Sequence, residues 1–260
     1  MKNTYNNLIK QLIKITLEAS KIISDRKPND VLYNKDSIRE IVTNHDLEIN
    51  KFLIESLKKT KIPVLSEEKK TSNLIYNEKK FWVIDPIDGS VNYINNSPNF
   101  AISIGLINNK KFTLGCVCLP AHSQFYFNTN NEKSYLNGIL IAHEHKKISN
   151  SLIGVSLNSF PSDKEMMLFK KINNLSLGCL RTGSTSMNIC WTAINRFQAS
   201  YGFNVKIWDV AGALAIARSS GCKVLIKQNS DNTLDFIVGS NNAVKEIFKQ
   251  SKKFIYGKYN

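Results

Sequence analysis

The stretch WVIDPIDGSVNY, Trp82 to Tyr93, joins an apolar run to a polar loop. Residues 81–84 are all apolar and predict a buried strand, which an aspartate follows at once. Pro86 cannot donate to a sheet ladder, so we expect the strand to stop there. Gly89 lets the backbone approach a ligand closely, and Ser90 adds a hydroxyl. The stretch therefore predicts a strand that delivers two carboxylates, three positions apart, into a loop.

Composition places the chain among ordinary globular proteins. Its 260 residues are 42% hydrophobic. The sequence contains no run of about 18 apolar residues, so we expect no membrane span. The first residues, MKNTYNNLIKQLIK, lack the apolar core of a signal peptide. Five scattered cysteines are typical of small core residues in a reducing compartment, so we expect a cytoplasmic protein.

The net charge of +14 raises nucleic acid as a possible partner. Only five of the 35 basic residues are arginine, however, and the lysines are spread along the chain. Recognition of bases and phosphates favours the planar arginine fork. The pattern therefore argues against a dedicated nucleic-acid-binding protein.

Hydrophobic periodicity predicts a mixed α/β fold. Apolar residues recur at helical spacing over residues 1–25, and a loop is expected over 25–34. Alternating patterns predict antiparallel strands near 100–106, 112–118 and 124–127. Strands and helices alternate after residue 146. We expect two halves that pack tightly: an antiparallel-sheet half over 1–145, carrying the loop, and an α/β half over 146–260.

Acidic residues follow or open several apolar elements. Glu67 and Glu68 end IPVLSEE, Asp85 and Asp88 end FWVIDPID, and Asp209 opens WDVAGALAIA. Carboxylates presented together repel one another unless a cation lies between them. Oxygen ligands without clustered His or Cys favour Mg²⁺ over zinc. A magnesium site that also binds phosphate would suit this loop.

Each acidic residue also has an ordinary structural interpretation. Asp209 can be a helix cap, and Glu67-Glu68 can belong to a solvated charge run. Asp46 can serve only as the capping partner of Thr43. It is the joint occurrence of these residues that favours a site.

The motifs VTNHD, SEE, WVIDPIDGSVNY and IWDVAGALAIARSSG occur in the order and spacing of one family. In these motifs the chain resembles the inositol monophosphatase family of magnesium-dependent, lithium-sensitive phosphatases, over about Lys35 to Gly221. The resemblance implies a layered α-β-α-β-α sandwich of two packed sheets with helices. It also implies a metal-dependent phosphoric monoester hydrolase and a homodimer.

The resemblance also implies roles for individual residues. Two or three Mg²⁺ ions would be held by five groups: the side chains of Glu67, Asp85, Asp88 and Asp209, and the carbonyl of Ile87. Glu67 and Ser90 would activate the attacking water, with Asp46 bonded to the Ser90 hydroxyl. Substrate contacts would come from Asp88, Gly89, Ser90, Asp209 and Lys35.

The chain departs from this family where the substrate is expected to bind. Gly202 stands where inositol-hydrolysing members carry a glutamate that binds sugar hydroxyls. Lys206 and Arg196 are near this segment and could favour a second phosphate. The four histidines are expected to be surface or supporting residues.

Three functions follow as hypotheses. The leading one is hydrolysis of inositol monophosphate or a similar small polyol or sugar phosphate by a metal-activated water. The alternative within the family is a 3′(2′),5′-bisphosphate nucleotidase or another sugar-phosphate phosphatase. Outside enzymology, the charge allows a binding role toward RNA or the transcription machinery. The motifs do not fix the true substrate.

Overall fold

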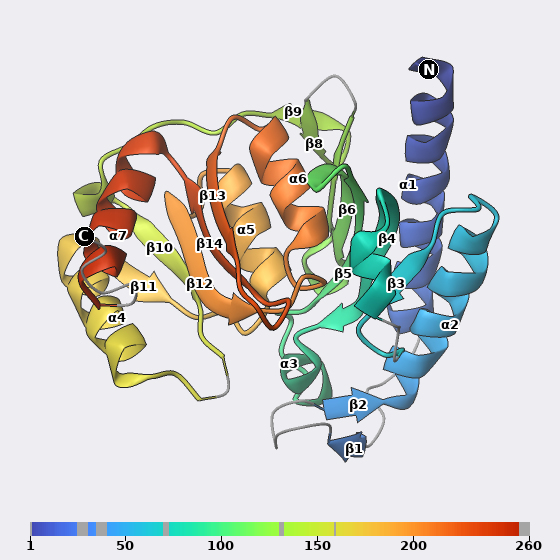
Figure 1. Cartoon of the computed structure of the whole chain (residues 1–260), viewed down its shortest axis with the longest axis horizontal. Coiled ribbons are helices and arrows are strands. Elements are labelled where there is room, and N and C mark those ends of the chain that lie inside the picture. The colour runs from blue at the N-terminus through green and yellow to red at the C-terminus, as the bar shows by residue number, and fades with distance from the viewer. Residues whose placement is uncertain are drawn as a thin grey trace.

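A computed structural model describes residues 2–24, 31–34, 41–69, 73–129, 133–158 and 160–254. Two packed sheets alternate with three helical layers, which confirms the predicted α-β-α-β-α sandwich (Figure 1). No helix in these ranges is both long and apolar enough to cross a membrane. The helices are α1 Lys2–Ser24, α2 Asn44–Lys58, α3 Ser90–Ile94, α4 Asp163–Leu175, α5 Thr185–Ala193, α6 Ala211–Ser219 and α7 Asn241–Phe254.

The larger sheet has seven strands in sequence order, from β3 to β9. Its strands are β3 Val64–Ser66, β4 Lys80–Asp88, β5 Ala101–Asn108, β6 Lys111–Leu119, β7 Gln124–Asn128, β8 Ser134–Leu136 and β9 Ile139–Ile141. Only the pair β3–β4 is parallel, and the predicted neighbours β5, β6 and β7 are antiparallel as expected.

The smaller sheet has five strands in the order β11-β10-β12-β14-β13. Its strands are β10 Leu152–Ser156, β11 Gly178–Leu180, β12 Ala199–Val205, β13 Lys223–Gln228 and β14 Leu234–Gly239. Strand β10 runs parallel to both of its neighbours, β11 and β12, so the carboxyl ends of these three strands share one edge. Near the larger sheet, β1 Val31–Asn34 and β2 Ile41–Thr43 form a separate antiparallel pair.

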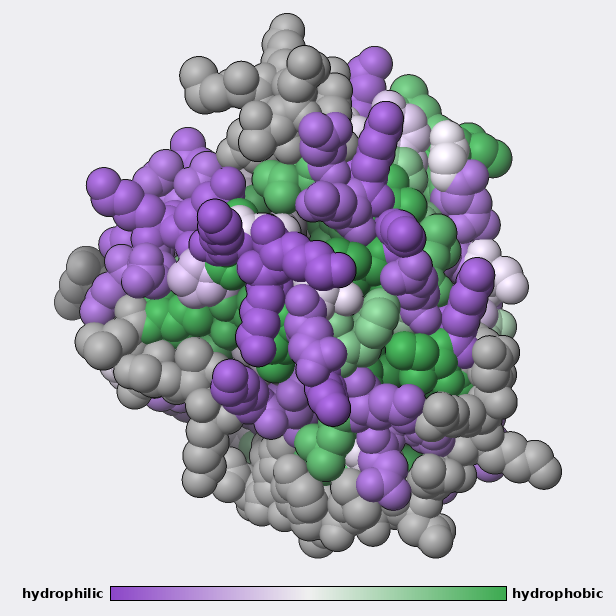
Figure 2. Space-filling model, turned by 90° about the vertical axis from the view of Figure 1, so that its right-hand side faces the viewer, coloured by the Kyte–Doolittle hydropathy of each residue, from purple (hydrophilic) through white to green (hydrophobic). Residues whose placement is uncertain are grey.

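Helices fill the space around and between the sheets. Helices α1 and α2 cover the outer face of the seven-stranded sheet, α5 and α6 lie between the sheets, and α4 and α7 cover the far side (Figure 1). In the layer between the sheets, α6 is apolar on all sides and buried from Ala211 to Ala217, whereas α5 also buries polar residues such as Asn188. The outer face of α1 and α2 carries mostly hydrophilic side chains, with apolar side chains between them (Figure 2).

Helix α6 lies in main-chain contact with the seven-stranded sheet. A Cβ atom added at Gly105 on β5 would lie 2.7 Å from the carbonyl carbon of Ala211. One added at Gly212 would lie 2.8 Å from the Ile104 carbonyl oxygen. Real Cβ atoms do not approach so closely, so glycine is required for this packing. The contact holds the start of α6, next to Asp209, against the sheet that carries Asp85.

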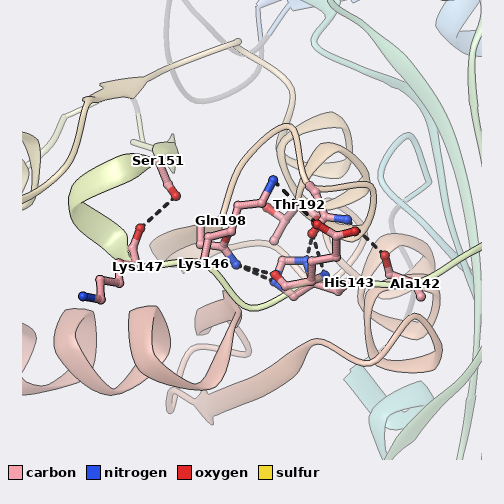
Figure 3. Close-up of polar contacts among 9 residues, drawn as sticks. Ala142, His143, Lys146, Lys147, Ser151, Thr192 and Gln198 are labelled. Atoms are coloured by element: carbon pink, nitrogen blue, oxygen red, sulfur yellow. Dashed lines mark hydrogen bonds and ion pairs between the residues drawn. The ribbon is translucent and has the colours of Figure 1, made fainter.

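The segment between the two sheets is anchored by His143 (Figure 3). Its backbone amide donates to the Ser220 carbonyl at 2.7 Å, and Nδ1 lies 2.9 Å from the Thr192 carbonyl. Gln198 Nε2 lies 3.0 Å from Nε2 of the ring. Burial lowers the pKa of His143, so the neutral ring donates to Thr192 and accepts from Gln198. The predicted domain boundary at residue 145 falls in this segment, and the division into two domains stays a prediction.

Several local predictions were wrong. Residues 31–34 form strand β1 rather than part of a loop. Pro86 does not end β4, which continues to Asp88 through a register shift between Asp85 and Asp88. Such a bulge leaves one residue unpaired, so the missing proline N–H leaves no gap in the ladder. Of the two roles expected for the histidines, the supporting one applies to His45 and His143, because both are buried and hydrogen-bonded.

Candidate active site

One cavity of about 440 Å³ lies where the two sheets and α6 meet. Side chains from both sheets line it, as does the loop that follows β4. The acidic residues of its lining are Glu67, Asp85, Asp88 and Asp209. Segments more than 100 residues apart in the sequence thus present carboxylates to one space.

Three of these carboxylates form a cluster. Within the described part of the chain, one oxygen each from Glu67, Asp85 and Asp209 lies within 4.8 Å of the other two. Glu67 follows β3, Asp85 lies on β4, and Asp209 precedes α6. Asp85 is 1% exposed, and its Oδ1 atom is buried without a hydrogen-bond partner among the described residues. A buried carboxylate oxygen without a donor is unfavourable unless a cation satisfies it.

The electrostatics of the cluster agree with that conclusion. Burial, followed by repulsion from Glu67, raises the pKa of Asp85 well above its usual value. Burial and repulsion from Asp88 and Glu67 likewise raise the pKa of Asp209. Both shifts express the free-energy cost of several negative charges in one enclosed place. A divalent cation would remove that cost.

Asp88 is bound to the start of α5. Its Oδ2 atom accepts from the Ser184 hydroxyl at 2.8 Å and from the Ser186 amide at 2.6 Å, and Oδ1 accepts from the Thr185 amide at 3.2 Å. Burial raises the pKa of Asp88 to about 6, although these hydrogen bonds oppose the shift. Oδ2 accepts two of these hydrogen bonds and Oδ1 only one, so Oδ1 keeps a further lone pair for a cation. Asp88 thereby joins the end of β4 to the start of α5.

Ser90 lies beside both a carboxylate and a carbonyl. Its hydroxyl oxygen is 3.2 Å from Asp46 Oδ1 and 2.9 Å from the Ile87 carbonyl. The other oxygen of Asp46 accepts from the amide and hydroxyl of Thr43, at 2.7 and 2.6 Å. Asp46 therefore has both of the roles considered from sequence, because one oxygen caps α2 and the other faces Ser90. Burial raises the pKa of Asp46 to about 6.

Asp209 does not cap its helix. The N-cap position of α6 is Val210, without a side-chain hydrogen bond, whereas Asp209 Oδ2 accepts from the Lys206 amide at 3.2 Å. The interpretation of Asp209 as a helix cap is therefore wrong. Gly89 also lines the cavity, with a φ of 101° that disfavours any other residue.

The structure brings almost all of the predicted site residues together. Lys35 lies outside the described residues. Lys206 lines the cavity as expected, but Arg196 does not belong to the described lining, since its guanidinium lies 4.8 Å from the centre of the Trp191 ring. Sequence reasoning missed Arg181, which does line the cavity. It also missed the serine donors to Asp88, because the residues that bind this carboxylate are almost 100 positions away.

The comparisons with known proteins agree with this geometry. The model of the family described as "Inositol monophosphatase family" matches residues 4–252. Inositol monophosphatase 1 of Bos taurus is 27% identical over 233 residues, which is 85% of this chain and 84% of that protein. Inositol monophosphatase of Dictyostelium discoideum is 31% identical over 193 residues, 70% of each chain.

Solved structures share the fold. The extragenic suppressor protein suhB of Bartonella henselae superposes with a TM-score of 0.86 at 18% identity, over 96% of this chain and 100% of that one. An inositol monophosphatase of Thermotoga maritima gives 0.84 at 20% identity, over 96% and 98% of the two chains. A layered fold, a cluster of carboxylates and a family match along almost the whole sequence thus coincide. The chain belongs to the inositol monophosphatase family and is a phosphoric monoester hydrolase.

Proposed function

We propose that this protein is a Mg²⁺-dependent phosphomonoesterase acting on inositol monophosphate or a similar small polyol or sugar phosphate. The observation that carries the proposal is the convergence of Glu67, Asp85 and Asp209 in one cavity, with a buried Asp85 oxygen that has no donor. The family is one of metal-dependent phosphatases acting on small phosphorylated substrates. Family membership supports the reaction type, and the cluster supports its location in this chain.

The donor set fits magnesium. Glu67, Asp85 and Asp209 would hold it, together with Asp88 and the Ile87 carbonyl, for a total of two or three ions. All of these donors are oxygens, and carboxylate and carbonyl oxygens are the ligands of a hard cation. When bound, Mg²⁺ would neutralise the phosphate and lower the pKa of a coordinated water.

The residues around Ser90 would position the attacking water. When the Ser90 hydroxyl donates to Asp46 Oδ1, its oxygen lone pairs are directed so that they can accept a hydrogen bond from the attacking water. Above pH 6 Asp46 is mostly ionised and remains a good acceptor. Glu67, half-buried in the same cavity, would be the second group to orient the water. The amides of Gly89 and Ser90, and Lys35, would contact the phosphate.

A 3′(2′),5′-bisphosphate nucleotidase, or another sugar-phosphate phosphatase of the family, is the second candidate. The observation that favours it is Gly202, which leaves the cavity without the expected glutamate. Further proposals concern the setting of the enzyme. We expect a homodimer by resemblance, a cytoplasmic location consistent with five free cysteines, and inhibition by lithium.

Phosphate release from a panel of esters, with Mg²⁺ and with a chelator, tests the proposal. Asp209→Asn and Asp88→Asn should remove almost all turnover while the protein stays folded. Asp163→Asn is the matched control, because this aspartate is exposed on α4, outside the cavity lining. Full turnover in the chelator, or in either cavity variant, would overturn the assignment. A biological role that survives Asp88→Asn would instead favour binding to RNA.

A further inference from the structure

A second wall of the cavity comes from the carboxyl ends of three parallel strands. Leu157 and Asn158 follow β10, Arg181 follows β11, and Lys206 follows β12. Because β10 lies between β11 and β12 in the sheet, Arg181 and Lys206 flank the β10 end from both sides. Carboxyl ends of parallel strands are where open α/β sheets bind ligands. Neighbouring strands are about 4.8 Å apart, so β11 and β12 are about 10 Å apart across the sheet. Arg181 is level with Val155 and Tyr201, so Lys206 lies further along the strand direction, toward the carboxyl end of β12.

This wall is cationic, whereas the metal-site wall is acidic. The described lining residues that follow β10 and β11 include no acidic residue, and Asp209 belongs to the carboxylate cluster. Arg181 and Lys206 are both exposed, and neither forms an ion pair with another described residue. A substrate whose ester phosphate lies at the carboxylates would extend its other end toward these cations. The charge of Lys206 also acts on Asp209 and Asp231, but two exposed cations in a partly enclosed cavity still favour an anion there.

Gly202 on β12 is not among the described lining residues and supplies no side-chain acceptor for sugar hydroxyls. This residue pairs with Ser156 on β10, and a Cβ atom added to it would lie 2.8 Å from Phe236 and 2.9 Å from the Ser156 Cβ. The space that an acidic side chain would need is thus already filled. A neutral polyol therefore meets no acidic group at this position, whereas a phosphate can accept charged hydrogen bonds from the cations that line the cavity.

We infer that Arg181 and Lys206 are specificity-determining residues that select phosphomonoesters carrying a second phosphate group. The inference rests on the proposed function, because it takes the carboxylate cluster as the place where the ester is hydrolysed. Arginine suits the role through its planar fork, and lysine supplies a point charge on the other side. The combined charge of +2 matches a phosphate dianion better than a carboxylate.

Matched esters on one carbon skeleton test the inference. We would compare kcat/KM for fructose 1,6-bisphosphate with fructose 1-phosphate, and for adenosine 3′,5′-bisphosphate with adenosine 3′-phosphate. The bisphosphate should be preferred about tenfold, because two exposed charged contacts provide about threefold each. The preference should shrink as salt rises from about 0.05 to 0.5 M. A third pair, 3-phosphoglycerate and glycerol 3-phosphate, should show a weaker preference for the carboxylate.

Arg181→Gln and Lys206→Gln should each lower the efficiency for the bisphosphate about threefold, and together about tenfold, and should leave the monophosphate unchanged. Arg196→Gln removes the same charge above Trp191, outside the cavity lining, and should change neither substrate. Melting temperatures would verify that the variants are folded. Equal efficiencies for the paired esters, or equal losses on both, would overturn the inference while Mg²⁺-dependent hydrolysis stands. If no ester is hydrolysed, the proposed function fails, and calorimetric affinities of the same pairs decide whether the wall binds a second phosphate.

Discussion

Replacing Asp85 with asparagine should stabilise the metal-free protein and, at the same time, abolish its activity. The oxygens of Asp85, Glu67 and Asp209 lie within 4.8 Å of one another. At that distance and an effective dielectric constant of about 20, two unit charges repel by about 3.5 kcal/mol. Asparagine removes two such pairs. It loses no hydrogen bond at Oδ1, because that atom has no partner among the described residues.

Protonation already relieves part of this repulsion. The pKa of Asp85 is raised, so in the metal-free protein this carboxylate can bind a proton. Binding the proton costs less free energy than keeping all three carboxylates ionised. We therefore expect a net gain of about 1–2 kcal/mol in the free energy of unfolding. For a chain of this size that corresponds to about 2–8 °C in melting temperature.

Calorimetric melting in a chelator and in excess Mg²⁺ would measure both effects. Mg²⁺ at about 100 times its dissociation constant should stabilise the unmodified protein by about 2.7 kcal/mol, whereas the melting temperature of Asp85→Asn should hardly respond. Asp163→Asn should behave like the unmodified protein in both conditions. If Asp85→Asn melts lower than the unmodified protein in chelator and still gains fully from Mg²⁺, the carboxylates do not share a cation.

Three further predictions follow from the same site. Gly202→Ala should destabilise the protein by about 1–3 kcal/mol in denaturant titrations, because the added Cβ atom would overlap Phe236 and Ser156. Unchanged stability would contradict this close packing. Asp209→Asn should melt no lower than the unmodified protein in a chelator and lose turnover by orders of magnitude, and near-normal turnover would remove this residue from the metal site. The metal-free protein should lose stability as pH rises from about 4 to 7, because Asp46 holds a proton up to about pH 6 when folded but only to 3.8 when unfolded. That shift corresponds to about 3 kcal/mol for this one group, and a melting temperature that rises with pH in a chelator would contradict it.

Long apolar patterns made most of the fold predictable. The alternation over β5 and β6 and the helical spacing of α1 extend over enough residues to define a period. Strands β2, β3, β8 and β9 have three residues each, too few for such a signal. The prediction that Pro86 ends the strand was wrong because it assumed a regular ladder of hydrogen bonds. The ladder is irregular between Asp85 and Asp88, where a bulge accommodates the proline.

The acidic cluster was predictable for a different reason from the cationic wall. Carboxylates directly after apolar runs are unusual, and their sequence context is visible locally. Arg181 is an exposed basic residue in a chain with many of them, and its own neighbours carry no signal. It becomes notable only when the parallel order β11-β10-β12 brings it to the same cavity as Lys206. Pairing between strands far apart in the sequence is information that a single chain does not display.

The glycine contact between α6 and the seven-stranded sheet allows the core to change in sequence while the site keeps its geometry. Side chains in a core can exchange volume and change rotamer, so layers that they hold apart can shift as the sequence drifts. Main-chain atoms have no such freedom, and at Gly105 and Gly212 they touch directly. The separation of Asp85 and Asp209 is therefore fixed mainly by the radii of backbone atoms. Apolar residues elsewhere between the sheets can be replaced over evolution while the spacing of these two carboxylates stays the same.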